Sequence, residues 1–363
     1  MERLNLHMAI GLAAHFRVIV IGPRGARTAL PASIEVHECG RGTLRSFLVA
    51  AWFRSLRAAV KTSPAWIVAG SGLTAPMAWM AARLSGARMA TYVHGLDLVV
   101  DNTLYRALWL PFVRRMDACI ANSANTARLA RAAGVPESAL HIVHPGVALP
   151  EPRPPQDAVA AFRRRNGLEG RPILLSVGRM TERKGLREFV LQALPTIRRW
   201  HPTALLVVIG DEAPDALAGA AVGAWSRLRD EADAAGLGDA LVHLGVLDDQ
   251  QLSAAYASGD VHVFPIRDVP GDVEGFGMVA VEAAAHGLPT VAFAVGGAPD
   301  AVSDGVTGYL VGAGDYDAFA QRVIQVLDGD RAPGEALIAF AERFAWPEFI
   351  RRLTAILARA GAA

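Results

Sequence analysis

The sequence has 363 residues, of which 52% are hydrophobic and 20% are charged. This composition excludes a disordered chain, and the length predicts two domains rather than one. The formal net charge of +1 excludes a bulk attraction to nucleic acid, and the two cysteines, Cys39 and Cys119, are too few for a disulfide framework, which fits a reducing compartment.

Six short apolar runs in the first half are typical of buried strands, and helical patterns separate most of them. The runs are RVIVIG (17–22), IEVHEC (34–39), AWIVAG (65–70), MATYVHG (89–95), ACIANS (118–123) and LHIVHPG (140–146). Residues 62–82 carry no charge and are long enough to span a bilayer. Proline and glycine residues interrupt this stretch, so it is predicted to form a strand, a turn and a buried helix instead.

The proline-rich stretch ALPEPRPPQ (148–156) is the best linker in the sequence. After it the pattern restarts with PILLSVG (172–178), ALLVVIGD (204–211), LVHLGV (241–246), VHVFP (261–265), TVAFAVGG (290–297) and TGYLV (307–311). We therefore expect an N-terminal domain at 1–149, a C-terminal domain at 150–345, and a helix at 346–363 that crosses back to the first domain.

Strand–helix alternation predicts the α/β class, with each domain a doubly wound, Rossmann-like parallel sheet. Two such domains are expected to face each other across a cleft. Ligands bind such folds at the carboxyl ends of the strands.

The segment DVEGFGMVAVEAAAHGLP (272–289) places two glutamates in an otherwise small and apolar run. A helix is predicted to start near Phe276 or Gly277 and to end at His286 and Gly287. Free amide groups at a helix start suit a phosphate, and glycine lets the backbone approach a ligand closely.

Glu274 lies just outside this helix start, and Glu282 lies about two turns inside it. A carboxylate accepts hydrogen bonds from sugar hydroxyls. A diphosphate at the amides with one glutamate on each side is the expected arrangement of a bound nucleotide sugar.

The first loop of the same domain, LLSVGRMTERKG (174–185), adds two cations, Arg179 and Lys184. Cations at a strand-to-helix loop would neutralise a diphosphate and stabilise it as a leaving group. The alternative is a pair of solvated loop residues, which becomes less attractive beside the glutamate segment.

At this point the chain resembles family 4 of the retaining glycosyltransferases, which have the GT-B fold. The resemblance rests on VGRMTERKG, on LGVLDDQQLSAAYASGDVHVFP, and on the Glu-x7-Glu spacing in EGFGMVAVEAAAHGLP. It covers almost all of residues 80–363, and the loop form GDVEGFG is most similar to that of bacterial phosphatidylinositol mannosyltransferases.

The resemblance implies roles for particular residues. Arg179 and Lys184 would bind the donor diphosphate, Glu274 the hydroxyls of the donor sugar, and Glu282 the ribose. His94 would reach from the first domain to the donor sugar, with Asp97 on the acceptor side. The full donor site would comprise Gly178, Arg179, Lys184, Val246, Glu274, Gly275, Phe276, Gly277, Met278 and Glu282, and the catalytic set His94, Arg179, Lys184 and Glu274.

The expected reaction moves a sugar from a GDP-mannose or UDP-sugar type of donor to a glycan or lipid-linked acceptor, as in polysaccharide biosynthesis. Relatives retain the anomeric configuration, and the motifs contain no obvious nucleophile. The departing phosphate is then expected to take the acceptor proton, with no metal or cofactor.

Several alternatives compete with this interpretation. Gly70, Gly72 and Ala75 match a dinucleotide fingerprint and would suggest an oxidoreductase, but no acidic residue ends the next strand. A glycoside hydrolase also uses two carboxylates, although Glu282 inside a helix suits ribose better. A sugar-nucleotide epimerase shares the two-domain fold.

A truncated, inactive relative is the most serious alternative. In the family a first strand and a Gly-Gly loop precede the helix that corresponds to ERLNLHMAIGLA (2–13), so the first strand of the N-terminal domain is expected to be missing. That strand is central in a doubly wound sheet, and its loss would expose two strand edges.

Basic and aromatic residues in SFLVAAWFRSLRAAVK (46–61) and TLYRALWLPFVRRMD (103–117) suggest a surface that binds anionic lipid. Two ordinary core-facing helices with solvated arginines are the alternative. The expected location is the cytoplasm, at the inner face of the cell membrane as a peripheral protein.

Overall fold

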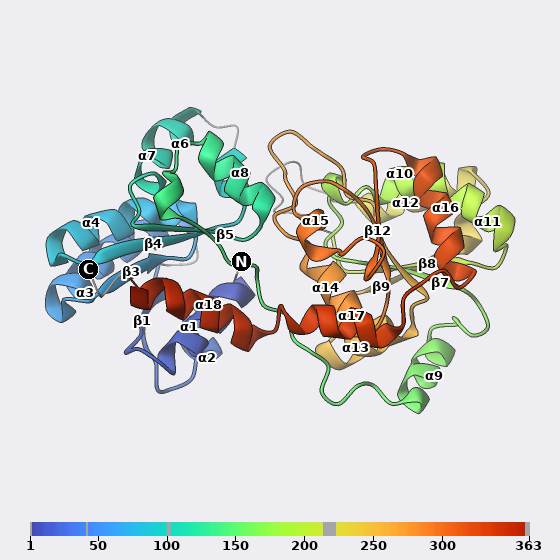
Figure 1. Ribbon diagram of the computed structural model, residues 1–363, viewed down its shortest axis with the longest axis horizontal. Coiled ribbons are helices and arrows are strands. Elements are labelled where there is room, and N and C mark those ends of the chain that lie inside the picture. The colour runs from blue at the N-terminus through green and yellow to red at the C-terminus, as the bar shows by residue number, and fades with distance from the viewer. Residues whose placement is uncertain (1, 41–42, 100–102, 213–222, 360–363) are drawn as a thin grey trace. The chain divides into compact units, whose positions relative to one another are not determined.

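The computed structural model describes residues 2–40, 43–99, 103–212 and 223–359. The chain divides into two compact units, one formed by residues 1–146 with 346–363 and the other by residues 147–345. Figure 1 shows helices alternating with strands in both units, and every ladder between the named strands is parallel. The predicted α/β class is therefore confirmed, and each of the twelve predicted strand segments overlaps one strand.

The second unit is built on one six-stranded sheet with the order β12-β11-β10-β7-β8-β9. In chain order this is 6-5-4-1-2-3, a doubly wound arrangement that reverses between β7 and β10. The strands are β7 (Ile173–Val177), β8 (Leu205–Ile209), β9 (Leu241–Gly245), β10 (Val261–Phe264), β11 (Thr290–Phe293) and β12 (Gly308–Val311).

Helices cover both faces of this sheet. Alternate strand residues point to opposite faces, and their apolar side chains are buried on both. Leu174, Leu206 and Val208 belong to one buried cluster, and Leu175 and Val207 belong to the other. The helices of the unit are α9 (Gln156–Arg165), α10 (Leu186–Glu188), α11 (Leu194–Trp200), α12 (Ala224–Ala234), α13 (Asp249–Ser258), α14 (Met278–Ala285), α15 (Ala298–Ala301), α16 (Tyr316–Leu327) and α17 (Gly334–Glu342).

The helical pattern KGLREFVLQALPTIRRW (184–200), which follows β7, is interrupted in the structure. A π-helical turn at Phe189–Ala193 separates α10 from α11. Pro195 lies at the start of α11 and has no N–H to donate to the preceding turn, which explains why a regular α-helix does not run through this point.

The first unit contains two separate parallel sheets. β1 (Ile19–Pro23) pairs with β2 (Glu35–Cys39), and the second sheet has the order β3-β4-β5-β6. The strands of the second sheet are β3 (Trp66–Ala69), β4 (Arg88–Val93), β5 (Ala118–Ala121) and β6 (Leu140–Ile142). Among the described residues no strand joins β1 to β3, and both strands are half-exposed along most of their length.

The helices of the first unit include one from the end of the chain. Figure 1 shows α18 (Trp346–Arg359) beside α1 (Glu2–Ala13), and the His7 and Trp346 rings stack at 3.8 Å. A β-carbon on Gly11 would lie 2.3 Å from Ile350, so glycine allows this close packing. The other helices are α2 (Ala26–Ala29), α3 (Leu44–Thr62), α4 (Ala75–Ser85), α5 (Leu96–Val99), α6 (Thr103–Leu108), α7 (Leu110–Val113) and α8 (Ala124–Ala132).

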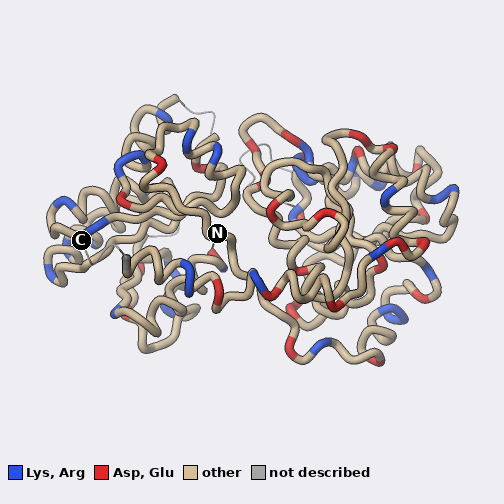
Figure 2. Tube along the Cα trace, in the orientation of Figure 1, with Lys and Arg blue, Asp and Glu red and all other residues tan. Residues whose placement is uncertain are grey.

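Acidic and basic residues are interspersed along the chain in Figure 2, as expected from a net charge near zero. Cys39 and Cys119 are buried and free.

Candidate active site in the second unit

Two loops at the carboxyl ends of the adjacent strands β7 and β10 form the centre of the site. They leave the sheet where the strand order reverses, which is the usual ligand position in such sheets. The Arg267 amide donates to the Arg183 carbonyl at 2.8 Å. Gly185 has φ +65°, and a β-carbon there would lie 2.0 Å from the Pro265 carbonyl oxygen, so only glycine fits where these loops meet.

Four buried charges connect the two loops. The Arg183 guanidinium donates to Asp272 Oδ1 at 3.0 Å and also to the Glu274 carboxylate. Lys184 Nζ lies 2.9 Å from Glu274 Oε2 and 4.7 Å from the centre of the Phe264 ring. All four charged side chains are at most 15% exposed. Charges buried this deeply are tolerated because each is paired.

The protonation of Glu274 follows from these neighbours. Burial alone would raise the pKa of its carboxyl, but the adjacent Lys184 and Arg183 outweigh burial and hold that pKa below its usual value. Glu274 is therefore ionised at neutral pH and can accept hydrogen bonds. Lys184 Nζ and Glu274 sit together in this structure, so the predicted phosphate-binding cation also contacts the predicted sugar-binding carboxylate.

At the start of α14, a bound ligand would meet backbone groups rather than side chains. Gly277 caps the helix with φ +97°, and Met278 is its first residue. The Phe276 ring is 2% exposed and packs against Phe344. A contact between Phe276 and a donor would thus involve its amide. The Gly297 amide donates to the Glu274 carbonyl at 2.9 Å and holds the loop against the sheet.

Glu282 lies in the second turn of α14. Its Oε2 accepts a hydrogen bond from the Tyr256 hydroxyl of α13 at 2.9 Å. The helix ends at His286, followed by Gly287 with φ +74°, which is close to the predicted end.

Three further predicted residues lie at the same edge of the sheet. Gly178 follows β7 with φ +137°, and a β-carbon there would contact the Lys184 side chain at 3.4 Å. Arg179 is exposed directly after it. Val246 follows β9 and is 74% exposed, a position where an apolar side chain can meet a flat ring.

His94 and Asp97 lie in the first unit, after β4. The His94 backbone amide donates to Asp97 Oδ2 at 3.0 Å. The Nε2 atom of the His94 ring donates to the Gly70 carbonyl at 3.1 Å. Burial lowers the pKa of His94, and the Asp97 charge offsets this only in part. The predicted reach of His94 to the donor sugar stays a prediction.

Three residues of this site were missed from the sequence. Arg183 and Asp272 complete the charge cluster, and Tyr256 contacts Glu282. The sequence did contain a signal for the charge cluster. DVE carries a second acidic residue beside Glu274, and the loop TERKG carries a second cation beside Lys184.

The described residues contain no group of three or more His, Cys, Asp or Glu that could hold a metal ion. They also contain no helix with the length and apolar character needed to cross a membrane.

Known proteins share this sequence pattern. Residues 159–343 match the family described as glycosyl transferases group 1, and residues 1–150 match glycosyltransferase family 4. A GDP-mannose-dependent alpha-(1-6)-phosphatidylinositol monomannoside mannosyltransferase of Mycolicibacterium smegmatis is 33% identical over 274 residues, covering 72% of this chain and 67% of that protein. The protein of the same name from Mycobacterium tuberculosis is 34% identical over 278 residues, with the same coverage of 72% and 67%.

Solved structures share the fold. HepE of Anabaena, in complex with UDP and glucose, has a TM-score of 0.81 at 18% identity and covers 99% of this chain and 95% of its own. A glycosyltransferase from Rickettsia africae has a TM-score of 0.82 at 17% identity, with coverage of 99% and 95%. The predicted GT-B fold and the predicted enzyme class, a hexosyltransferase, are confirmed by these matches, and none of them supports an epimerase or an inactive relative. The chain belongs to glycosyltransferase family 4.

Proposed function

We propose that this enzyme moves a hexose from a nucleoside diphosphate sugar to a glycan or lipid-linked acceptor, with retention of configuration at the anomeric carbon. The observation that carries this proposal is the buried cluster of Arg183, Lys184 and Glu274 next to the amides that begin α14. Cation, carboxylate and the backbone amides of a helix start within two touching loops suit a ligand that carries both phosphate and sugar hydroxyls.

Each part of the donor has a binding group in this proposal. Arg179, Lys184 and the amides of residues 275–278 bind the diphosphate. Glu274 accepts hydrogen bonds from the sugar, Glu282 from the ribose, and Val246 flanks the base. The names of the relatives support a GDP-mannose donor, whereas HepE supports a UDP-sugar.

The proposed reaction breaks the bond between the anomeric carbon and the phosphate oxygen, and forms a bond to the acceptor oxygen on the same face. The departing phosphate oxygen takes the acceptor proton, so the protein supplies no nucleophile. Arg179 and Lys184 neutralise the charge that develops on the diphosphate, which stabilises the transition state more than the ground state. His94 is assigned to the donor sugar and Asp97 to the acceptor side.

Calorimetric titration with GDP, UDP and ADP tests the donor site. One nucleotide is expected to bind with a dissociation constant in the micromolar range. Glu282→Ala should weaken that binding by about 10- to 100-fold, because the ribose hydroxyls lose their acceptor. Glu335→Ala removes an exposed glutamate of α17 in the same unit and should leave the affinity unchanged. Failure of all three nucleotides to bind to the unaltered protein would contradict the proposal.

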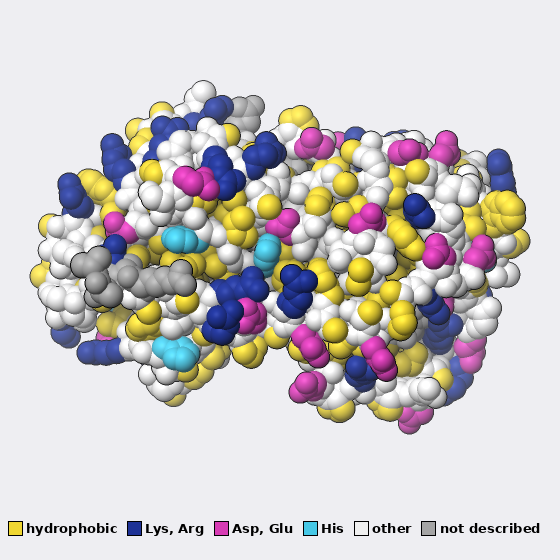
Figure 3. Space-filling view, viewed as in Figure 1, with side chains coloured by type: hydrophobic (Ala, Val, Ile, Leu, Met, Phe, Trp, Pro, Cys, Tyr) yellow, Lys and Arg dark blue, Asp and Glu magenta, His cyan; other side chains and the backbone are white. Residues whose placement is uncertain are grey.

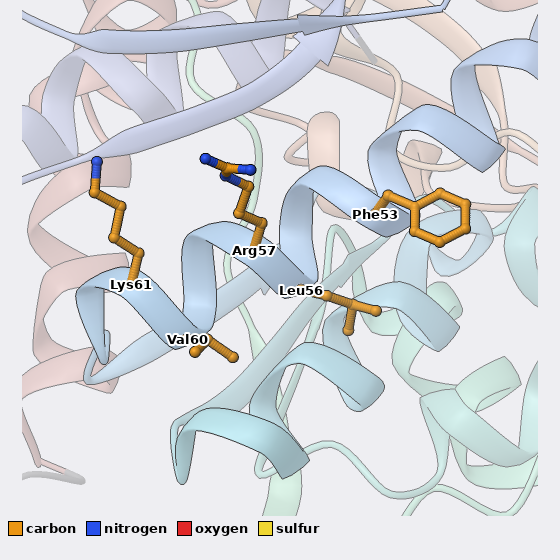
Figure 4. Close-up of a pocket in the computed structure, with 5 residues that line it drawn as sticks. All are labelled: Phe53, Leu56, Arg57, Val60 and Lys61. Carbon is orange, nitrogen blue, oxygen red and sulfur yellow. The ribbon is translucent and has the colours of Figure 1, made fainter.

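We also propose that α3 contacts an anionic membrane surface at the inner face of the cell membrane. Val49, Phe53 and Val60 are 60–67% exposed and lie on one stripe of the helix. Figure 4 shows Arg57 and Lys61 pointing to one side of α3, while Leu56 and Val60 point to the other. These residues line a shallow pocket of about 540 Å³. An apolar stripe beside a basic one is typical of helices that lie in a lipid interface.

The second predicted segment does not contribute its aromatic rings to this surface, and a membrane contact of residues 103–117 stays a prediction. Trp109 Nε1 donates to the Leu73 carbonyl at 3.0 Å, and the Phe112 ring packs on Trp79 at 5.3 Å. These rings pack within the unit, and α7, which contains Phe112, packs on α4. Figure 3 shows that Lys and Arg are frequent on the visible face of the first unit and Asp and Glu on that of the second.

Flotation with anionic vesicles tests the membrane contact. The protein is expected to float with phosphatidylglycerol-containing vesicles at low salt and to be released by high salt, because the attraction of exposed charges is screened. Replacing Arg54, Arg57 and Lys61 together with glutamine should abolish flotation.

The matched control replaces three exposed arginines of the second unit with glutamine, at Arg153, Arg164 and Arg165. This variant has the same net charge and should still float. Equal loss in the two triple variants would show a response to net charge alone and would contradict the assignment to α3.

A further inference from the structure

Tyr256 is a buried residue for which the sequence motifs provide no role. It lies near the end of α13 and is 2% exposed, yet its hydroxyl reaches Glu282 Oε2 of α14 at 2.9 Å. A buried tyrosine hydroxyl needs a partner, and an ionised carboxylate is a strong one. The partner here is the residue that the proposed function assigns to the ribose.

A second contact orients the Tyr256 ring. The His286 imidazole stacks on it with centroids 5.1 Å apart and an angle of 23° between the planes. His286 Nδ1 donates to the Glu282 carbonyl at 2.8 Å, since a carbonyl only accepts. Burial lowers the pKa of His286, so the ring is neutral and its Nε2 accepts from the Ser253 hydroxyl at 2.8 Å.

The Tyr256 hydroxyl bonds to the Glu282 carboxylate, and His286, which bonds to the Glu282 backbone carbonyl, holds the Tyr256 ring in place. Ser253 and Tyr256 belong to α13, Glu282 belongs to α14, and His286 directly follows α14. The histidine is bonded to both helices and packs flat against the tyrosine. A rotation of the tyrosine ring would give up both the stacking and the bond to Glu282. A glutamate side chain otherwise loses rotamer freedom when it binds a ligand, and ordering it beforehand removes that cost.

We infer that Tyr256 is a positioning residue that holds the Glu282 carboxylate in the orientation that accepts the ribose hydroxyls. This inference rests on the proposed function. It adds that the donor site selects ribonucleotides over dideoxyribonucleotides. Tyr256 acts through Glu282 and does not touch the donor.

Calorimetry with two ligands tests the role. The probes are the nucleoside diphosphate that binds the unaltered protein and its 2′,3′-dideoxy analogue, each titrated into the unaltered protein and Tyr256→Phe. The loss of one hydrogen bond to a charged group is expected to weaken ribonucleotide binding about 10-fold. The dideoxy analogue has no hydroxyls for Glu282, so Tyr256→Phe is expected to lower its affinity by less than about 2-fold.

Tyr309→Phe is the matched control, because it removes a tyrosine hydroxyl that donates to the Asp330 carbonyl at 3.2 Å elsewhere in the unit. It should bind both ligands as the unaltered protein does. Equal weakening of both ligands by Tyr256→Phe, or of neither, would overturn the inference while Glu282→Ala still supports the donor site. Absence of ribonucleotide binding to the unaltered protein would overturn the proposed function and the inference together.

Discussion

Lys184→Met is expected to lower kcat for sugar transfer by about 100- to 1,000-fold, the usual loss when one group that stabilises transition-state charge is removed. Methionine keeps an apolar stem against the Phe264 ring but removes the ammonium group. That group lies 2.9 Å from Glu274 Oε2 and is assigned to the diphosphate that leaves. The measurement is a steady-state assay of donor consumption in the presence of acceptor.

The control for Lys184→Met is Arg187→Met. Arg187 is 58% exposed and pairs with Glu231, so it has the same charge in the same region but lies outside the cluster. Its kcat should stay within about 2-fold of the unaltered enzyme, as expected for a surface ion pair. A kcat for Lys184→Met within about 3-fold of the unaltered value would contradict the role of Lys184 in stabilising the leaving group.

Glu274→Gln is expected to abolish transfer and to lower the free energy of unfolding by about 3 kcal/mol, the lower end for breaking a buried ion pair. The amide keeps the shape of the side chain but cannot neutralise Arg183 and Lys184, which are 13% and 15% exposed. Asp272 then remains the partner of Arg183, and Lys184 loses its carboxylate. Urea unfolding followed by circular dichroism measures the difference.

The difference in free energy of unfolding between the unaltered protein and Glu274→Gln should decrease at low pH. The folded state holds the pKa of Glu274 below 4.5, its ordinary value, because Lys184 and Arg183 outweigh the effect of burial. The contribution of Glu274 is therefore complete above pH 4.5 and is lost as the pH falls through the lower, folded-state pKa. The difference between the unaltered protein and Glu274→Gln should shrink below pH 4.5.

Glu182→Gln is the control for this second prediction. Glu182 is 60% exposed and lies 3.4 Å from Arg267, so its removal should cost no more than about 0.5 kcal/mol. Equal stabilities of Glu274→Gln and Glu182→Gln at pH 7 would show that the buried cluster does not hold the two loops.

Much of the fold could be predicted because each strand is a short apolar run that ends at glycine, proline or a polar residue. The runs at 172–178 and 204–211 became β7 and β8, which are buried along their whole length. The first unit divides into two sheets, β1-β2 and β3-β4-β5-β6, and each lies on predicted apolar runs. The interruption of the helix at 184–200 was not predicted, although Pro195 gave a local signal for it.

The candidate site could be predicted only in part, for a physical reason. Glu274, Glu282 and Lys184 stand out because charges in apolar or loop segments are costly without a partner. The identity of each partner depends on tertiary contacts. Arg183 meets Asp272 only because two loops 89 positions apart in the sequence touch, and Tyr256 meets Glu282 only because α13 packs beside α14. Spacing along one segment carries no information about such pairs.

A crystal structure with the bound nucleoside diphosphate would locate the donor site. We expect the diphosphate at the amides of residues 275–278, within hydrogen-bonding distance of Arg179 and Lys184, and the ribose hydroxyls on Glu282. A nucleotide bound elsewhere, such as at the Gly70–Ala75 turn of the first unit, with Glu274 and Glu282 making no contact to it, would contradict the assignment of the donor site.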